Sequence, residues 1–447
     1  MRRLVRALLG FLCRVFFRRI EVAGAGRVPA TGPVIFCPNH PNALVDPVLL
    51  LATAPRPVSF LAKAPLFDMP VIGWFARALD AIPVYRAQDF PAGRPDNAGM
   101  FRAARAVLDA GGAIAIFPEG TSHSDPDLKP LKTGAARLAL GAGTAHPVQV
   151  VPVALNYTAK STFRSAALVC FGDPITVAPM SAAGEPPPAE VAAVTAAIAG
   201  GMREHLLVAR ARESLELANQ LERLFLSDGG PPGRRPGLAE SAELRRRLLE
   251  AYPEVARRDP ERAARLRARL DRHDARLRGA GMIPEMLVAR PFTLGGVIAY
   301  TLRSAGYVAL AGPLALPGLV IHYPVYRLIG VLARRVAGES QDVVATAKGL
   351  GALLLLPLAW LAVGAAVGAG LGWPWGVAAA LAAPLTGWAA LRLVERLDHV
   401  LGATRALALW LLGRERFLRL LVERRRLRDE VLALAHEAGM VTAGPAA

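Results

Sequence analysis

The longest uncharged stretch of the sequence restricts the fold more than any other feature. Between Lys348 and Arg392 no Asp, Glu, Lys or Arg occurs for 43 positions. A helix needs about 20 apolar residues to cross a bilayer, so the stretch can hold two spans. The segment 369-AGLGWPWG-376 provides a turn with Trp residues suited to a membrane interface. The sequence therefore predicts a transmembrane helical hairpin over residues 346–394.

The charges that flank the hairpin predict its orientation. Arg334, Arg335 and Lys348 precede it, Arg392 and Arg396 follow it, and the turn is uncharged. Basic residues favour the cytoplasmic side of a membrane. We therefore expect a cell membrane protein, in a bacterium the inner membrane, with both termini and the large domains in the cytoplasm.

A second uncharged segment lies at residues 304–326. Pro313, Pro317 and Pro324 interrupt it, and proline removes a helical hydrogen bond and clashes with the preceding turn. The pattern predicts a membrane-associated, proline-broken region over 291–345, re-entrant or interfacial rather than a third span.

Composition narrows the partners. The formal net charge is +17, and 53% of the residues are hydrophobic. A basic excess is typical of proteins that bind nucleic acid or an anionic membrane face. The apolar content and the lack of an aromatic-bearing basic motif favour the lipid surface and argue against nucleic acid. Three widely separated cysteines argue against disulfides and a zinc site.

Residues 1–20 predict an amphipathic helix. On a helical wheel most of the apolar side chains share one half and most of the arginines share the other, which is typical of a helix in the membrane interface. The apolar run is short, and no cleavage site follows it, which argues against a signal peptide. The alternative is a helix that covers the core of its own domain.

Residues 21–180 alternate short β-rich runs with helical stretches. This alternation predicts an α/β domain with a mainly buried sheet flanked by helices. The β-rich runs are 33-PVIFC-37, 57-PVSFLA-62, 113-AIAIF-117, 148-VQVVPVAL-155 and 167-ALVCF-171. A helical cytosolic region over 181–290 and a helical tail over 395–447 complete the predicted organisation.

The stretch 36-FCPNHPNALVDPVLL-50 carries the first chemical signal, because His40 and Asp46 stand in an otherwise largely apolar run. In a continuous helix two residues six apart do not face each other. Pro41 fits the first turn of a new helix, which would leave His40 at a loop-to-helix junction from which its ring can reach Asp46. Such a pair can take a proton from a hydroxyl. The alternative is that both residues cap local turns.

Two further segments resemble an anion site. Arg86 follows an apolar run, and 117-FPEGTSHSDPDLKPLKTGAARLALGAG-143 joins a Glu-Gly turn to hydroxyls, His123 and lysines. Arginine side chains and the N–H groups of glycine turns commonly bind phosphate.

Together with 150-VVPVALNY-157, these blocks resemble the glycerolipid acyltransferases that build phosphatidic acid, over about residues 22–175. That family's first motif usually reads His-x4-Asp, whereas this chain has His-x5-Asp. The longer spacing is similar to that of the fungal dual glycerol-3-phosphate/dihydroxyacetone-phosphate acyltransferases and their bacterial relatives. The lysophosphatidate branch usually has Arg where this chain has Ser122.

The resemblance implies a membrane-bound O-acyltransferase in phospholipid biosynthesis. His40, oriented by Asp46, would deprotonate the acceptor hydroxyl, which attacks the thioester of acyl-CoA or acyl carrier protein, and no bound cofactor or metal is implied. The acceptor would be glycerol 3-phosphate or dihydroxyacetone phosphate. Pro152 would shape the acyl or donor side, and Lys63 would face phosphate or lipid headgroups. The implied acceptor-binding residues are Arg86, Glu119, Gly120, Thr121, Lys132 and Arg164.

Three alternatives accompany this reading. Lysophosphatidate could be the acceptor, although Ser122 argues against it. The chain could be an inactive membrane scaffold or lipid carrier, which the presence of both His40 and Asp46 disfavours. A transporter is disfavoured because the spans contain no acidic residue.

Overall fold

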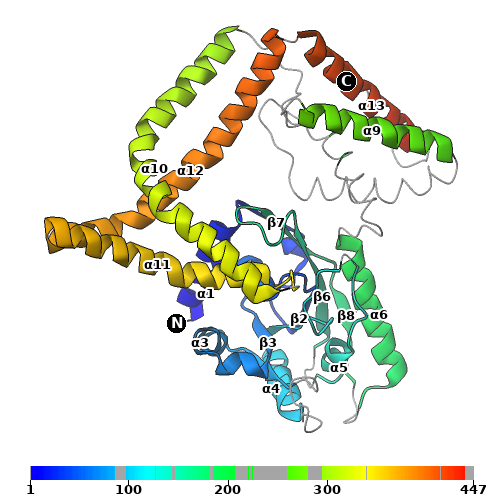
Figure 1. The fold of residues 1–447 in the computed structure, drawn as a ribbon. Helices are drawn as coiled ribbons and strands as arrows, with labels where there is room; N and C mark the ends of the chain where they lie inside the picture. Colours follow the sequence, from blue (N-terminus) through cyan, green and yellow to red (C-terminus); the bar gives the residue numbers. More distant parts are fainter. Residues whose placement is uncertain are drawn as a thin grey trace. The chain divides into compact units, whose positions relative to one another are not determined.

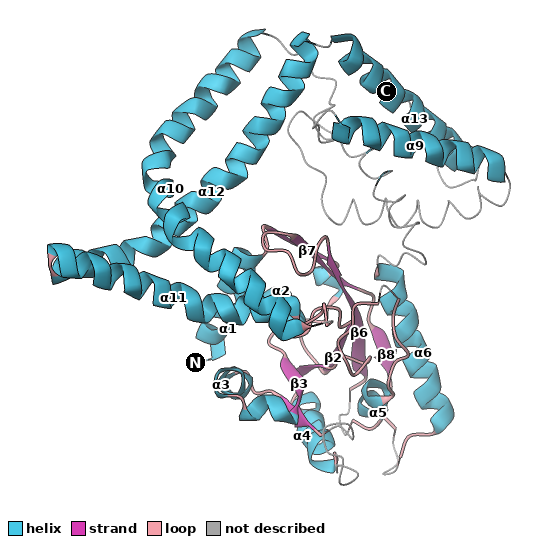
Figure 2. Cartoon of the chain, viewed as in Figure 1, coloured by secondary structure: helices cyan, strands magenta, loops and turns pink. Residues whose placement is uncertain are grey.

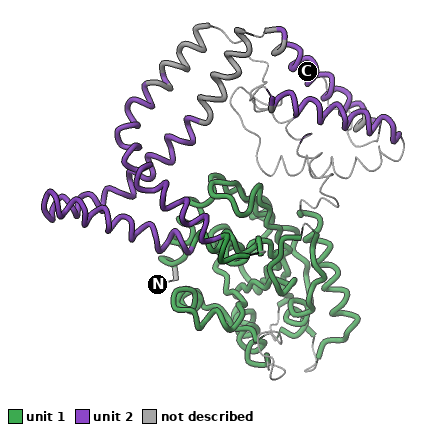
Figure 3. Tube along the Cα trace, viewed as in Figure 1, with its two compact units in different colours: residues 1–208, 334–349 green, residues 209–333, 350–447 purple. Residues whose placement is uncertain are grey.

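The computed structural model describes residues 2–85, 97–125, 127–142, 146–180, 185–206, 220, 224, 259–279, 294–338, 340–412 and 414–437. By its internal contacts the chain divides into two compact units (Figure 3). The first unit comprises residues 1–208 and 334–349, and the second comprises residues 209–333 and 350–447. Each unit is described by itself below.

An eight-stranded sheet forms the centre of the first unit, in the order β1-β7-β6-β2-β5-β3-β4, with β8 paired to β6 (Figure 1). Strands β6, β2, β5, β3 and β4 run parallel, β7 and β8 pair antiparallel to β6, and β1 is parallel to β7. The strands are β1 (Arg19–Ala23), β2 (Val34–Pro38), β3 (Ser59–Lys63), β4 (Ile82–Val84), β5 (Ala113–Ala115), β6 (Val148–Tyr157), β7 (Ala166–Phe171) and β8 (Ile175–Val177).

Helices cover both faces of this sheet, which confirms the predicted α/β class (Figure 2). Strand β2 shows why the run reads as continuously apolar. Val34 and Phe36 pack into one core with α1 and α2, whereas Ile35 and Cys37 pack into the other with α4, α5 and α6, and all four are fully buried. The helices are α1 (Arg2–Phe16), α2 (Val45–Thr53), α3 (Pro70–Ala78), α4 (Ala98–Asp109), α5 (Gly134–Leu140) and α6 (Pro188–His205), with short 3-10 turns η1 (Ala25–Arg27) and η2 (Ala64–Asp68).

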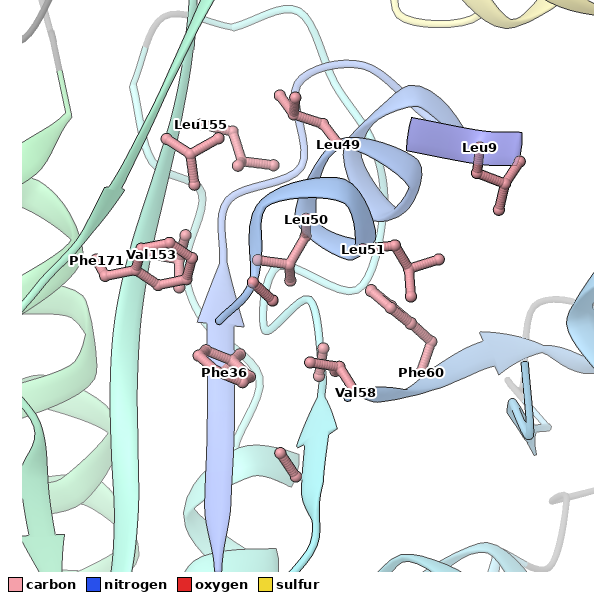
Figure 4. Close-up of a cluster of buried hydrophobic side chains, with 14 of the residues drawn as sticks. Leu9, Phe36, Leu49, Leu50, Leu51, Val58, Phe60, Val153, Leu155 and Phe171 are labelled. Atoms are coloured by element: carbon pink, nitrogen blue, oxygen red, sulfur yellow. The ribbon is translucent and has the colours of Figure 1, made fainter. Parts of the chain in front are cut away.

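Helix α1 has two apolar stripes with different surroundings. Val5, Leu9 and Cys13 are buried in the core that α2 and the sheet share, and Figure 4 shows part of this core with Leu9 of α1 and Leu49, Leu50 and Leu51 of α2 labelled. This stripe matches the alternative in which the helix covers its own domain. The other stripe, Leu4, Leu8 and Phe11, is 75%, 44% and 61% exposed. Its contact with a membrane stays a prediction.

The second unit contains most of the long apolar helices α10 (Leu294–Ala337), α11 (Val344–Leu371) and α12 (Trp373–Leu412). The C-terminal end of α10 and the N-terminal end of α11 belong to the first unit. The three prolines that were expected to interrupt this region, Pro313, Pro317 and Pro324, lie inside α10, which remains helical through them. Apolar surroundings favour a continuous helix, because only helical hydrogen bonds can pair the remaining backbone N–H and C=O groups there. The carbonyl that each proline leaves without a donor can be satisfied by local adjustment or by a neighbouring helix.

Among the described residues, three stretches are long and apolar enough to cross a membrane, where two were expected: Gly306–Ala337, Val344–Leu371 and Trp373–Leu397. Small residues let the last two approach closely after the turn at Gly372. A Cβ added to Gly376 would lie 2.5 Å from the carbonyl oxygen of Gly364. Close contact of this kind is how helices associate where both are surrounded by apolar groups.

Two charged helices, α9 (Pro260–Gly279) and α13 (Arg414–Glu437), pack together within the second unit. Their ion pairs are Arg262–Glu437, Arg269–Glu430 and Arg276–Glu423. From one ion pair to the next the residue number rises by seven in α9 and falls by seven in α13. The two helices are therefore antiparallel, and the ion pairs recur every two helical turns. Most of the 181–290 region predicted to be helical lies outside the described residues.

Candidate active site

His40 lies in a loop, residues 39–44, which joins the end of β2 to the start of α2; we call it the His40 loop. Residues 41–44 form a turn, and α2 begins only at Val45. The sequence suggested that Pro41 occupies the first turn of this helix. In the structure Pro41 instead lies in the loop before the helix. Asp46 lies in that first helical turn, and the turn places it within reach of His40.

Asn39 fixes the start of this loop against the neighbouring strand. Its side-chain oxygen accepts from the N–H of Leu155 at 2.7 Å, and its side-chain nitrogen donates to the Leu155 carbonyl at 3.2 Å. The amide thereby extends the pairing of β2 with β6 by one position beyond Pro38. Asn39 is buried, so these bonds also satisfy polar atoms that water cannot reach.

The predicted pair of His40 and Asp46 is formed. His40 Nδ1 lies 2.8 Å from Asp46 Oδ2. Since a carboxylate only accepts hydrogen bonds, Nδ1 carries the proton and Nε2 holds the free lone pair. The Asp46 side chain is fully buried, whereas 19% of the His40 side chain is exposed. The imidazole is thus accessible and the carboxylate bonded to it is not.

Two more donors hold the Asp46 carboxylate. The Asn42 N–H donates to Oδ2 at 2.7 Å, and the Tyr157 hydroxyl donates to Oδ1 at 2.6 Å. Burial, followed by the charge and hydrogen bond of Asp46, raises the pKa of Tyr157 well above its usual value, so this phenol keeps its proton and remains a donor. Sequence reasoning missed Tyr157, although it ends the block 150-VVPVALNY-157 that was singled out.

The ring of His40 is also held by stacking. It lies against Phe117 with the ring centroids 4.1 Å apart and the planes 24° from parallel. Among the described residues, no protein group is hydrogen-bonded to His40 Nε2. The ring is therefore fixed on one face and at one nitrogen, while the other nitrogen can receive a substrate.

Glu119 was predicted to bind the acceptor, which would require an accessible carboxylate, but the structure places it in the interior. It is buried, and its carboxylate accepts from the His40 N–H at 2.8 Å and from the Lys129 N–H at 3.0 Å. His123 Nε2 bonds to the same carboxylate, and the His123 N–H donates to the His40 carbonyl at 3.1 Å. Glu119 and His123 thus brace the backbone of the His40 loop, whereas Asp46 holds the His40 ring.

Gly120 and Lys132 lie together beside that brace. Gly120 has φ of 71°, a conformation that glycine adopts without strain, and an added Cβ would meet Lys132 Cε at 2.6 Å. Thr121 is exposed, and its hydroxyl donates to the Ser122 carbonyl at 3.3 Å. The turn and a lysine ammonium are therefore brought together as an anion site requires.

The other predicted residues have different surroundings. Arg164 Nη1 donates to the carbonyls of Arg14 and Val15, in the last turn of α1, where arginine commonly satisfies unpaired carbonyls. Pro152 packs its ring against Gly201 of α6. Lys63 is exposed at the end of β3. Arg86 lies outside the described residues.

A cation that the sequence did not single out lies beside the His40 loop. Lys160 Nζ donates to the Pro41 carbonyl at 3.0 Å and to Ser124 Oγ at 2.8 Å. Its backbone carbonyl accepts from the Asn42 side chain at 3.0 Å. The ammonium is therefore tied to the residue that follows His40, and only the fold reveals this because Lys160 and His40 are far apart in the chain.

Comparison with known proteins gives matches over both units. Residues 19–156 match the family model described as Acyltransferase, and residues 223–441 match the Glycerol-3-phosphate acyltransferase 2 C-terminal domain. Glycerol-3-phosphate O-acyltransferase 1 of Saccharomyces cerevisiae is 28% identical over 79% of this chain and 60% of its own length. Glycerol-3-phosphate O-acyltransferase 2 of the same yeast is 24% identical over 79% of this chain and 63% of its own length.

A third match is shorter. A chloroplastic 1-acyl-sn-glycerol-3-phosphate acyltransferase of Brassica napus is 29% identical over 32% of this chain and 39% of its own length. The chain thus spans less than two thirds of the length of each of these relatives. The two yeast matches, by contrast, continue through most of this chain.

Proposed function

We propose that this chain, which carries an acyltransferase-family domain followed by a glycerol-3-phosphate acyltransferase 2 C-terminal domain, is a membrane-bound O-acyltransferase. It would move a fatty acyl group from a thioester to a hydroxyl of glycerol 3-phosphate or dihydroxyacetone phosphate. The observation that carries the proposal is the His40–Asp46 pair, in which a buried carboxylate orients an imidazole whose second nitrogen is accessible.

The reaction needs one base and one proton donor in sequence. His40 Nε2 takes the proton from the acceptor hydroxyl while the hydroxyl oxygen bonds to the thioester carbon. Asp46 favours the imidazolium that forms and keeps the ring in place. The tetrahedral intermediate then expels the thiolate, which takes the proton from His40. No acyl-enzyme forms, since the acceptor oxygen attacks the thioester directly.

The acceptor phosphate requires cations near His40. Lys132 beside the Gly120 turn is a candidate whose position supports this role. Lys160 lies beside the His40 loop, but its ammonium already binds the Pro41 carbonyl and Ser124 Oγ, so it would contribute charge rather than a direct contact. Arg86 keeps the role that the sequence suggests. Arg164 is less suited, because its guanidinium already binds the carbonyls at the end of α1. Thr121 would line the acceptor site, whereas Glu119 would act by bracing the His40 loop.

The membrane assignment rests on the apolar surfaces of both units. Besides the three candidate spans, α1 exposes Leu4 and Phe11, and α3 with its preceding residue exposes Met69, Val71 and Trp74. Surfaces of this kind suit an enzyme whose product is a lipid, because its acyl chain need not pass through water. Acyl-CoA or acyl carrier protein would serve as donor.

We further propose that α11 and α12 cross the membrane while α10 does not complete a third crossing. Residues 334–349 group with the first unit, so the C-terminal end of α10 stays on the side of the acyltransferase domain. Arg303 precedes the apolar part of α10, and the sequence from 209 to 303 holds no uncharged run long enough to span. Both ends of α10 then lie on the cytoplasmic side. Labelling of single cysteines at positions 303 and 372 tests this, with only the latter expected on the far side.

The yeast relatives lend no support to the bacterial inner membrane that the sequence suggested, and a cell membrane with the catalytic domain on its cytoplasmic side is our proposal.

The function is tested with purified protein and its His40→Ala variant. We would measure transfer to glycerol 3-phosphate, dihydroxyacetone phosphate and lysophosphatidate, each from acyl-CoA and from acyl carrier protein. Transfer to a three-carbon phosphate that the variant has lost is expected. Transfer to lysophosphatidate alone would replace the proposed acceptor, and equal activity of the variant would refute the mechanism.

A further inference from the structure

The short connector between α10 and α11 belongs to the first unit rather than to the membrane helices that flank it. We define it as residue 338 and residues 340–348, which include the first turn of α11. Figure 3 colours this segment with residues 1–208. Backbone bonds from the Ser340 N–H to Ala337 and from the Val343 N–H to Ser340 give it two successive turns. It is thus an ordered segment.

The first contact of the connector is with the loop that follows Glu119. Asp342 Oδ2 accepts from Ser122 Oγ at 2.5 Å. Asp342 is buried, with 9% of its surface exposed. Since a buried carboxylate needs partners, this bond links the connector specifically to the turn that braces His40.

The second contact is with the His40 loop. Thr346 Oγ1 accepts from the Leu44 N–H at 3.2 Å. Leu44 directly precedes α2, where backbone N–H groups have no partner within the helix. The connector thereby satisfies a donor two residues before Asp46.

The third contact is with the loop between β6 and β7. Lys348 Nζ donates to the Ser161 carbonyl at 2.7 Å. The preceding residue, Lys160, holds the Pro41 carbonyl. Burial lowers the pKa of Lys160, and the carboxylates of Asp342, Asp46 and Asp125 counter that effect. Asp342 therefore also acts electrostatically on the ammonium beside His40.

We propose that the connector is a positioning element of the active site, through which a lipid bilayer that holds α10 and α11 stabilises the reactive arrangement of the His40 loop. One short segment binds three separate loops around His40, and apolar helices follow and precede it in the chain. Arg334 and Arg335, which precede the segment and are exposed, are suited to hold it at the membrane surface. Restricting the helices in a bilayer restricts the connector, and hence the loops that it binds.

This inference rests on the proposed function, which it extends by naming the bilayer as the effector. It is tested with full-length protein in detergent and in vesicles of phosphatidylcholine with phosphatidylglycerol. Wild-type protein is expected to have a higher kcat in vesicles. Asp342→Ala is expected to reduce kcat in vesicles about tenfold and to remove most of that gain, with little change in the KM for acyl donor. Gln341→Ala is the matched control, because Gln341 is its exposed neighbour in the same segment.

A second pair of variants separates the hydrogen bond from simple packing. Thr346→Val preserves shape but removes the oxygen that accepts from Leu44, whereas Thr346→Ser keeps that oxygen. We expect Thr346→Val to reduce kcat about threefold and Thr346→Ser to retain it. Equal behaviour of the two, or a tenfold loss in Gln341→Ala, would overturn the proposal.

Hydrogen exchange gives a readout that needs no substrate. Peptides covering residues 39–46 are expected to exchange faster in Asp342→Ala than in wild type, and faster in detergent than in vesicles. Unchanged exchange would overturn the inference even where acyl transfer is intact. If wild type transfers to no acceptor, the proposed function fails, and the exchange rates alone decide whether the connector positions the loop.

Discussion

Two histidines of the first unit, His40 and His123, each bind a carboxylate, yet their different surroundings indicate different roles. His40 bonds to Asp46 through Nδ1 and presents a partly exposed ring. His123 bonds to Glu119 through Nε2 and is buried. The carboxylates differ as well, because Glu119 also binds the backbone of two loops, which suits a brace. We therefore propose that exposure, and the other partners of the carboxylate, distinguish the base from the structural histidine.

The largest effect is expected at His40. Replacing His40 by Asn should reduce kcat by about 10³-fold, because general bases contribute roughly 10²–10⁴. The same change at His123 should reduce kcat by less than about tenfold and lower the thermal unfolding temperature. Steady-state kinetics and thermal scans of both variants test the contrast. Similar kcat losses in the two would remove it.

The carboxylates extend the contrast. Asp46→Asn should lower kcat by about 10²–10³-fold while the fold stays intact, because the amide favours the wrong imidazole tautomer. Glu119→Gln should instead cost about 1–3 kcal/mol of stability, since the amide keeps one oxygen and places an NH2 group against the donors that bonded to the other. Denaturant unfolding beside kinetics checks this. A stable but inactive Glu119→Gln would place Glu119 with the reacting groups.

Tyr157 should have a smaller effect that does not vary with pH. Tyr157→Phe removes one donor to Asp46 and should reduce kcat about threefold to tenfold. The pKa of Tyr157 is raised well above the usual value near 10, so the phenol stays protonated at both pH 7 and pH 9. The loss should therefore be equal at these two pH values. Stability that depends on the protonated phenol declines only above about pH 10, where the unfolded chain ionises. A rate ratio that changes between pH 7 and 9 would contradict this role.

The smallest effect is expected at the side chain of Lys129. Its ammonium pairs with Asp125 at 3.1 Å on the surface, whereas its backbone N–H binds Glu119. Exposed pairs contribute little to stability, so Lys129→Ala should leave the thermal unfolding temperature nearly unchanged and should change kcat by less than about twofold. A larger loss would mean that this side chain serves the site directly.

The sequence predicted the sheet and the central pair because both are local signals. The apolar run of β2 and the residues between His40 and Asp46 lie within one short stretch. Tyr157 and Thr346 could not be predicted as partners of that stretch, because their contacts depend on strand order and on a segment some 300 residues away. The continuous path of α10 through three prolines was also missed, since the rule applied describes helices in water.

Roles that were predicted from residue type alone agree least with the hydrogen bonds in the structure. Glu119 and Arg164 were both expected at the acceptor, but Glu119 binds backbone donors and Arg164 binds backbone carbonyls. A charged side chain near a motif can serve the substrate or the chain itself. Only its hydrogen-bond partners distinguish the two.

The most direct test of His40 as the base is rescue by imidazole. His40→Gly and His123→Gly would be assayed for acyl transfer to glycerol 3-phosphate with increasing free imidazole. We predict that imidazole restores part of the activity of His40→Gly in proportion to its neutral form and leaves the rate of His123→Gly unchanged. Rescue of His123→Gly alone would contradict the assignment and make His123 the base.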